Sequence, residues 1–199
     1  MKYAFILLVF SIFLNGAYGQ EQSQESLTEK EQESFKNAHR ITLAMGHSYI
    51  RKGFDHNTSP RGILVPSWML DYDYWLTNRL ALGLQSDVVI DDFMVEDHLG
   101  GSEEIVFKRS FPVSVVPAVL VKPWKNLVCL AGAGRDFAPE GNFWLYRTGV
   151  EYGFNLPKQL ELNLSLTYDI KVDAYDMWTL GVGVSKVMLP HHAGHHKHS

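Results

Sequence analysis

Ten charged side chains occupy polar positions in segments where apolar and polar residues alternate. In a β-strand such positions share one face, so these side chains would gather on the polar side of a sheet. If that sheet closes into a barrel they meet inside it, where acids and bases pair or line a narrow polar passage. The residues predicted to form this lumen charge network are Asp71, Asp73, Arg79, Asp87, Lys108, Arg147, Glu151, Glu161, Asp169 and Lys171.

The C-terminal segment 189–199 holds five of the nine histidines of the chain. Clustered imidazoles bind Zn²⁺, Cu²⁺ or Ni²⁺ with moderate affinity and little selectivity. No cofactor is required; the acidic loop 91–104 could hold Ca²⁺ or Mg²⁺, but its spacing matches no EF-hand and a solvated loop is favoured. The predicted metal ligands are His191, His192, His195, His196 and His198.

Groups suited to catalysis are few and poorly placed. His47 and Ser48 are adjacent, so on a strand they point to opposite faces and cannot act as a dyad. No nucleophile motif surrounds any serine or histidine, and the sequence therefore predicts that the protein is not an enzyme. The other groups considered are His56 and Ser59 in a polar linker, and Ser86 and Asp87 on a strand.

The segment from Leu160 to Lys171 alternates apolar and polar residues without a break. A period of two would spread its leucines all around a helix, so the segment predicts a strand. About ten residues with one apolar and one polar face is the length that a tilted strand needs to cross a bilayer. The segment therefore predicts a membrane-spanning strand.

The same alternation recurs along the chain and predicts eight strands. In the fifth of them, small and apolar residues occupy both faces, so either face could point to lipid. Pro66, Pro112 and Pro117 each remove a ladder donor and are expected at rims or bulges. The predicted strands are 41–49, 63–74, 79–90, 105–121, 127–135, 143–154, 160–171 and 176–188.

The predicted connections and aromatic residues suggest two ends of different character. Long loops are expected at 51–61 and 91–104, connections of moderate length at 136–142 and 172–175, and short turns at 75–78, 122–126 and 155–159. Outer-membrane barrels have short periplasmic turns and longer outer loops. Two interfacial girdles are expected: Trp75, Trp124 and Phe154 near the short turns, and Tyr49, Trp144, Tyr168 and Trp178 near the loops.

The N-terminal residues 1–19 have the charge, apolar run and small-residue end of a cleaved signal peptide. An uncleaved anchor is the alternative, but the apolar run is shorter than the ~20 residues of a membrane helix. Removing residues 1–19 takes away one charged side chain, Lys2, so the formal net charge changes from −4 to −5. Residues 20–38 are rich in Glu, Gln and Ser and are predicted to form a flexible acidic leader.

The remaining composition excludes several classes of protein. The mature chain is mildly acidic and has no basic stripe, so no nucleic-acid partner is expected. Cys129 is the only cysteine, so no internal disulfide can form. Beyond the signal peptide there is no long apolar segment, so any membrane span must be made of strands.

Three sequence features together carry a family resemblance. They are the strand end Leu70–Trp75 with its short turn into Arg79–Gly83, the closing strand Leu180–Val187, and the eight alternating segments after a signal peptide. The chain resembles the small outer-membrane β-barrel proteins of the OmpA/OmpX/OmpW-like group. The resemblance implies contact with outer-membrane lipid and the barrel-insertion machinery, periplasmic termini, and a narrow conduit or pocket for a small solute. Val187, Met188 and Leu189 stand where such barrels usually end in an aromatic residue.

The sequence therefore predicts an all-β, eight-stranded, antiparallel, up-and-down transmembrane β-barrel at 39–188, with a signal peptide, disordered termini and a His-rich tail. Its expected place is a Gram-negative type outer membrane, and its expected role is structural or a minor route for a small solute. A soluble lipocalin-like barrel and a lipid-modifying outer-membrane enzyme are the alternatives. The inner glycines expected to leave room for a solute are Gly46, Gly83, Gly149, Gly153, Gly181 and Gly183.

Overall fold

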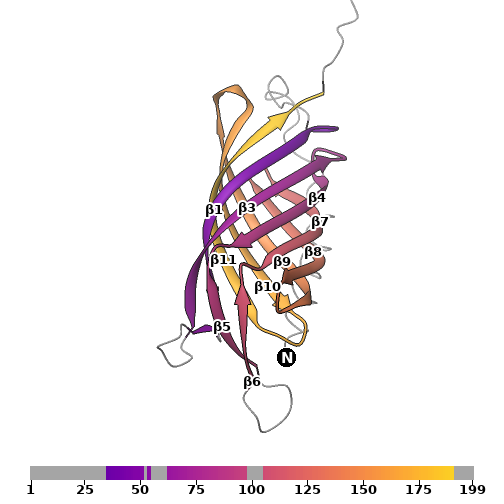
Figure 1. Ribbon diagram of the computed structural model, residues 1–199. Helices are drawn as coiled ribbons and strands as arrows, with labels where there is room; N and C mark the ends of the chain where they lie inside the picture. The colour runs from indigo at the N-terminus through magenta and orange to yellow at the C-terminus, as the bar shows by residue number, and fades with distance from the viewer. Residues whose placement is uncertain (1–34, 52, 55–61, 98–104, 191–199) are drawn as a thin grey trace, which may run out of the picture. The chain divides into compact units, whose positions relative to one another are not determined.

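A computed structural model describes residues 35–51, 53–54, 62–97 and 105–190 (Figure 1). The predicted signal peptide, most of the leader, the His-rich cluster and the two residues His56 and Ser59 lie outside the described residues. Eight strands form a closed barrel, in the order β1-β11-β10-β9-β8-β7-β4-β3. They are β1 (His39–Ile50), β3 (Ile63–Trp75), β4 (Leu80–Val89), β7 (Val113–Trp124), β8 (Leu127–Ala138), β9 (Gly141–Leu156), β10 (Leu160–Lys171) and β11 (Asp176–Met188).

Every barrel strand pairs antiparallel with its neighbours along the chain, and β1 pairs with β11 to close the barrel. The predicted fold class is confirmed. His39 lies opposite Met188, so the chain enters and leaves the barrel at the same end. We call this the short-turn end, because the β3–β4, β7–β8 and β9–β10 connections lie there, the last through a 3₁₀ turn, η1 (Pro157–Gln159). The opposite end is the loop end.

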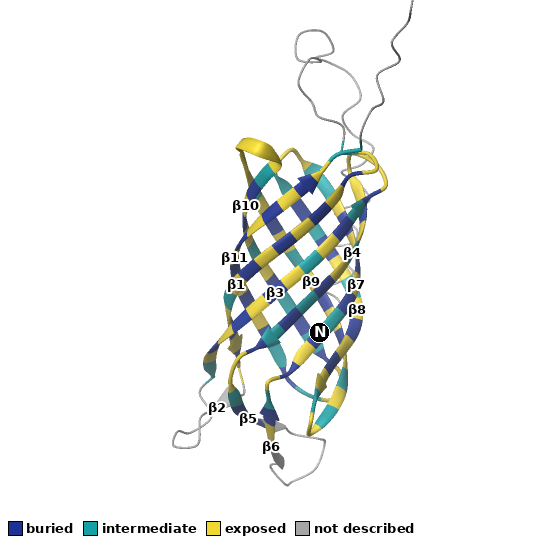
Figure 2. Ribbon diagram, turned by 45° about the horizontal axis from the view of Figure 1, so that its top comes forward, coloured by how far each residue is buried: buried dark blue, intermediate teal, exposed yellow. Residues whose placement is uncertain are grey.

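Alternation along the strands sets which side chains face inward, and Figure 2 shows it as exposed and buried residues in turn. On β10, Leu162, Leu164 and Leu166 are exposed, whereas Glu161 and Asn163 are buried. On β8, Val128 and Leu130 are buried, so the apolar or small residues at 129, 131 and 133 face outward. The structure thus assigns the strand whose two faces the sequence left open.

The predicted fourth strand is wrong as a single element. It breaks at Phe111, which has a φ of 45°, and at Pro112, which has no backbone N–H to donate. The part before the break, β6 (Ile105–Ser110), pairs with β5 (Asp92–Asp97), which pairs with β2 (Gly53–Phe54) in a separate three-stranded sheet. The predicted loop 91–104 therefore contains a strand.

The predicted loop at 136–142 is also wrong. Strand β8 continues to Ala138 and β9 begins at Gly141, so only two residues connect them. Gly141 has a φ of 151°, which a residue with a Cβ rarely adopts. Of the prolines, Pro112 lies at a strand end as expected, whereas Pro66 and Pro117 lie within β3 and β7, and no register shift occurs at either.

Two apolar clusters lie inside the barrel near its two ends. The short-turn plug comprises Ala38, Trp75, Ala81, Ala118, Leu120, Val128, Leu130 and Val187, with Phe35 and Leu189 packed against it. The loop-end plug comprises Ile50, Val65, Val89, Phe93, Val95, Tyr175 and Met177, with Ile63 and Ala174 packed against it. Polar side chains fill the lumen between the two plugs.

The last residues of the predicted leader are part of the short-turn plug. The backbone N–H of Asn37 donates to the carbonyl of Trp75 at 2.7 Å, and the Trp75 N–H donates to Ala38 at 2.9 Å. The Phe35 ring meets Trp75 edge-on, with 5.8 Å between centroids. Phe35, Asn37 and Ala38 are therefore held against the barrel. No helix in the described part of the chain is long and apolar enough to span a membrane.

Candidate functional site

The short-turn half of the lumen is organised around one guanidinium. Arg40 on β1 lies 2.7 Å from Asp73, 2.6 Å from Glu151 and 3.9 Å from Glu161, the distances joining its terminal nitrogens to carboxylate oxygens. Gln85 donates to the second oxygen of Asp73 at 3.1 Å. All five side chains are buried, so one cation serves three carboxylates out of contact with bulk water. We call this group the Arg40 cluster.

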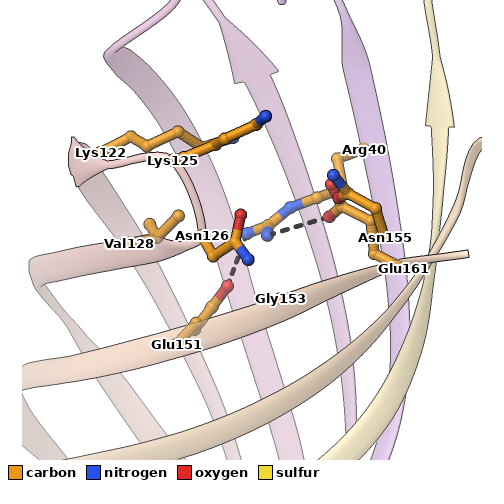
Figure 3. Close-up of a pocket in the computed structure, with 9 residues that line it drawn as sticks. All are labelled: Arg40, Lys122, Lys125, Asn126, Val128, Glu151, Gly153, Asn155 and Glu161. Atoms are coloured by element: carbon orange, nitrogen blue, oxygen red, sulfur yellow. Dashed lines mark hydrogen bonds and ion pairs between the residues drawn. The ribbon is translucent and has the colours of Figure 1, made fainter.

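A small pocket opens beside the Arg40 cluster toward the short-turn end (Figure 3). Lys122 and Lys125 lie on one side of it, and Arg40 reaches across to Glu151 and Glu161 on the other. The ammonium of Lys122 lies 3.7 Å from the centroid of the Phe35 ring and 4.7 Å from that of Trp75, in cation–π geometry. The free space is about 10 Å³, roughly enough for one water molecule.

The loop half of the lumen holds a second charge network. Arg147 forms ion pairs with Asp169, at 2.6 Å, and with Asp87. Asp136 accepts hydrogen bonds from Lys171 at 2.6 Å and from Arg109. Ser114 also donates to Asp136, at 3.1 Å, and Lys171 also bonds the Tyr175 hydroxyl, at 2.9 Å. The three acids and three bases are therefore equal in number, and we call this group the Asp136 cluster.

Hydroxyl groups and glycines occupy further positions on the inner wall of the barrel. Ser48 bonds Thr179 at 2.8 Å and Ser67 at 3.2 Å, and Thr42 bonds Ser185 at 2.5 Å. The inner glycines admit neighbouring side chains rather than a solute. A methyl group added at Gly181 would lie 2.4 Å from the terminal carbon of Met69, and one at Gly83 would lie 2.4 Å from Asp73.

Eight of the ten predicted lumen charges lie on the inner face of the barrel, all except Arg79 and Lys108. Arg79 is exposed in the β3–β4 turn, because β4 begins one residue later than the predicted strand. Lys108 lies on β6, outside the barrel, where it is 45% exposed and pairs with Asp92 at 2.6 Å. Both assignments were wrong, because the alternation was extended past the true strand ends.

Sequence reasoning missed Arg40, Arg109 and Asp136. Arg40 immediately precedes the predicted first strand and shares the inward parity of Thr42, so the signal for it was present. Asp136 was placed in a loop that does not exist. Arg109 comes from β6 and packs over the Phe143 ring at 4.8 Å, an interaction between segments that alternation cannot predict.

Two ionisable groups outside the barrel strands have shifted pKa values. Burial raises the pKa of Tyr175 in the β10–β11 connection, although the nearby Lys171 ammonium opposes that shift. Hydrogen bonds from Ser110 lower the pKa of Glu140 in the β8–β9 turn. At neutral pH the Tyr175 hydroxyl therefore stays protonated within the loop-end plug.

The groups considered for catalysis are separated. His47 faces outward, whereas Ser48 faces inward and is already hydrogen-bonded. The Ser86 hydroxyl donates to the carbonyl of Leu70, and Asp87 pairs with Arg147 inside the barrel. Nothing in this arrangement activates a nucleophile.

The aromatic residues expected at the interfaces face outward, with one exception. Trp124 is 70% exposed near the short turns, and Trp144 and Trp178 are exposed near the loops. Trp75 was wrongly assigned to a girdle. It shares the parity of Asp71 and Asp73, lies inside the barrel and is fully buried.

The chain matches no protein-family model and no curated protein. Among solved structures it is similar to Ail, the attachment invasion locus protein of Yersinia pestis, at 16% identity and a TM-score of 0.46, covering 77% of this chain and 99% of that one. It is similar to the outer membrane protein OprG from Pseudomonas aeruginosa at 10% identity and a TM-score of 0.47, covering 78% and 98%. It is also similar to Neisserial surface protein A at 14% identity and a TM-score of 0.45, covering 76% and 99%.

The class of protein is defined by the barrel itself. Large apolar side chains are exposed around its outside, among them Leu43, Leu64 and Leu180 at 54%, 62% and 62%. Charged side chains are buried within it, the reverse of a water-soluble protein. The protein is a small closed β-barrel with the apolar outside and polar inside of a membrane-spanning barrel, and the predicted eight-stranded antiparallel fold is confirmed.

Proposed function

We propose that the protein is a non-conducting outer-membrane β-barrel with a structural role, which holds its outer loops and the β2–β5–β6 sheet at the membrane surface. The observation that carries this proposal is the filling of the lumen. Apolar plugs lie near both ends, and paired charges lie between them. An eight-stranded barrel has an interior just wide enough for its own side chains.

The location follows from the apolar outside of the barrel. A water-soluble lipocalin-like barrel would expose its outer face to water, and this face carries many exposed leucines, valines and aromatic residues. A ligand-lined interior would be apolar, whereas this interior contains Arg40, Arg147 and their acids. Closed barrels that cross membranes in this way belong to the outer membrane of Gram-negative bacteria.

The filled lumen also bears on the proposed passage of a small solute. The pocket beside the Arg40 cluster has a free space of about 10 Å³, far below the hundreds of Å³ typical of a ligand pocket. We therefore favour the structural role over a binding or transport role. We also propose that the protein is not an enzyme, so lipid A and phospholipid profiles should be unchanged in cells that overexpress it.

Planar-bilayer recording tests the proposal directly. The wild-type protein should give no discrete conductance steps. Trp75→Ala together with Phe93→Ala removes one aromatic side chain from each plug, and we expect this double variant to give small or flickering steps. Discrete, stable steps from the wild-type protein would overturn the non-conducting role.

We propose separately that the histidines at 191, 192, 195, 196 and 198 bind Zn²⁺, Cu²⁺ or Ni²⁺, because clustered imidazoles do so without a fixed site. Calorimetric titration of the full chain against a chain ending at Pro190 isolates this tail. Equal Zn²⁺ uptake by both chains would refute the proposal.

The partners we propose are outer-membrane lipid and the barrel-insertion machinery.

A further inference from the structure

Exposed basic side chains gather at the short-turn end of the barrel. The acids in the described segments of this end are Asp73, Glu151 and Glu161, and all three are buried in the Arg40 cluster. The described segments of this end are 35–40, 73–83, 119–129, 151–162 and 184–190. We call their exposed cations the basic rim, which comprises Lys36, Arg79, Lys125, Lys158 and Lys186.

The basic rim is a surface of one charge sign, which the loop end is not. Among the described residues of the loop end, Asp91, Glu140 and Asp173 are exposed together with the bases Arg51 and Arg135. At the short-turn end no exposed carboxylate of the described segments offsets the cations. The rim therefore offers its positive charge to an anionic partner from outside these segments.

Lys186 shows that this positive charge lies on the apolar outer wall of the barrel. It shares its outward parity on β11 with Val184 and Met188, which are also exposed. Its cross-strand partner on β10 is Leu160. The Lys186 ammonium donates to the backbone carbonyl of Lys158 in the η1 turn, at 2.5 Å. The methylene stem therefore follows the apolar wall while the charge reaches the turn, as in a lysine that snorkels to a membrane interface.

Exposed aromatic side chains place the basic rim at a definite depth. Trp124 immediately precedes Lys125 and is largely exposed, and Phe154 is exposed three residues before the η1 turn. Aromatic side chains on the outside of membrane barrels mark the level of the lipid headgroups. The cations of the rim therefore lie where lipid phosphate groups lie.

We infer that the basic rim recruits anionic phospholipids to the short-turn end of the barrel, with Lys158 and Lys186 as the central contact. The inference rests on the proposed membrane location and adds the class of lipid and the end of the barrel that it contacts. A lipid phosphate at Lys186 lets the acyl chains lie along the apolar wall beside Val184 and Leu162. Basic side chains beside a membrane attract anionic headgroups, and salt screens this attraction.

The selectivity of the barrel surface for lipid headgroups tests this inference. The purified protein is inserted into phosphatidylcholine vesicles with a trace of spin-labelled phosphatidylglycerol or spin-labelled phosphatidylcholine. Electron paramagnetic resonance separates lipid immobilised at the protein from free lipid and gives an association constant for each. We expect the phosphatidylglycerol constant to be about threefold larger at low salt, with the ratio falling toward one at high salt. Equal constants at low salt would overturn the inference and leave the rim to water or to the five glutamates of segment 20–33.

Paired variants show which end of the barrel selects the lipid. Lys158→Gln together with Lys186→Gln should remove about half or more of the preference for phosphatidylglycerol. The matched control is Arg135→Gln, which removes an exposed cation beside the Trp144 ring at the loop end and should keep the preference. A full preference in the double variant, or an equal loss in the control, would overturn the assignment to the basic rim.

The same vesicles separate this inference from the proposed function. If the wild-type protein does not insert into phosphatidylcholine vesicles, the proposed membrane location fails, and the lipid site fails with it. If the protein inserts and immobilises both labelled lipids equally, the membrane location stands and only the lipid site fails.

Discussion

The two halves of the lumen differ in how far their buried acids and bases balance in number. The loop half contains three bases, Arg109, Arg147 and Lys171, and three acids, Asp87, Asp136 and Asp169. The short-turn half contains four acids, Asp71, Asp73, Glu151 and Glu161. Arg40 is the base that lies among them, and Lys122 and Lys125 line the pocket at the mouth of this half. The first half is neutral in formal charge, and the second is negative.

This difference separates a structural network from a responsive one. In the loop half each charge already has a partner, so a change of pH or of ion concentration should have little effect on its stability. In the short-turn half the surplus of carboxylates can be offset by protons, whose concentration depends on the medium. The loop half should therefore fail when any member is removed, and the short-turn half should respond to pH.

The largest effect is expected from Asp136→Ala, which breaks the loop half. Asp136 is fully buried and accepts from Arg109, Lys171 and Ser114, so its loss leaves two buried cations without a counter-charge. We expect the free energy of unfolding to fall by about 3–5 kcal/mol. Urea unfolding in lipid vesicles measures this. The exposed Asp91→Ala is the matched control, and an equal loss in both would contradict the prediction.

The next largest effect is expected from Arg40→Met, which breaks the short-turn half while keeping the volume filled. Asp73, Glu151 and Glu161 then repel one another at neutral pH, and the loss should be about 3 kcal/mol. Acidification protonates carboxylates, so the loss should shrink between pH 7.5 and pH 5.

The two variants should therefore respond to acid differently. The loss in Asp136→Ala should persist at pH 5, because this variant leaves cations without a counter-charge and acid does not neutralise cations. Urea unfolding midpoints of both variants and of the wild-type protein, measured at pH 7.5 and pH 5, test this difference. The same pH response in Arg40→Met and Asp136→Ala would remove the distinction between the halves.

A smaller effect is expected from Ser48→Ala, which changes an uncharged group of the inner wall. Its hydroxyl bonds Thr179 and Ser67, both hydroxyl-bearing and able to re-pair. The free energy of unfolding should fall by about 1 kcal/mol, independent of pH. A dependence on pH would show that these hydroxyl groups are coupled to the charged clusters. Urea unfolding under the conditions used for Arg40→Met provides the comparison.

The sequence predicted the barrel because strand parity is a local property. The alternation from Leu160 to Lys171 is enough to assign β10 and its two faces. Trp75 is two residues after the inward-facing Asp73, so the same alternation would have placed its side chain inside. Arg40 is two residues before the inward-facing Thr42, so the same alternation would have placed its side chain inside as well. The break at Phe111 was missed because the residues of β6 and β7 continue an apolar pattern across it.

Ion-pair partners could not be predicted, because they depend on contacts between strands far apart in sequence. Arg40 and Glu151 are separated by 111 positions, and Arg147 and Asp87 by 60. The alternation along the strands predicted which charged side chains face inward, but not the numbers of acids and bases in each half. The difference between the two clusters appeared only when the barrel brought β1 to β9 and β6 to β8.

The smallest effect is expected from Lys108→Ala, which also tests the boundary of the barrel. Lys108 would matter greatly if it belonged to the lumen, as its place in an alternating segment predicted. In the structure its pair with Asp92 is exposed on both sides, on β6 of the outer sheet. Water and salt screen such a pair, so we expect no measurable change in the free energy of unfolding, with Lys171→Ala as the buried comparison. A loss in Lys108→Ala approaching that of Lys171→Ala would return this residue to the lumen and join β6 to the barrel wall.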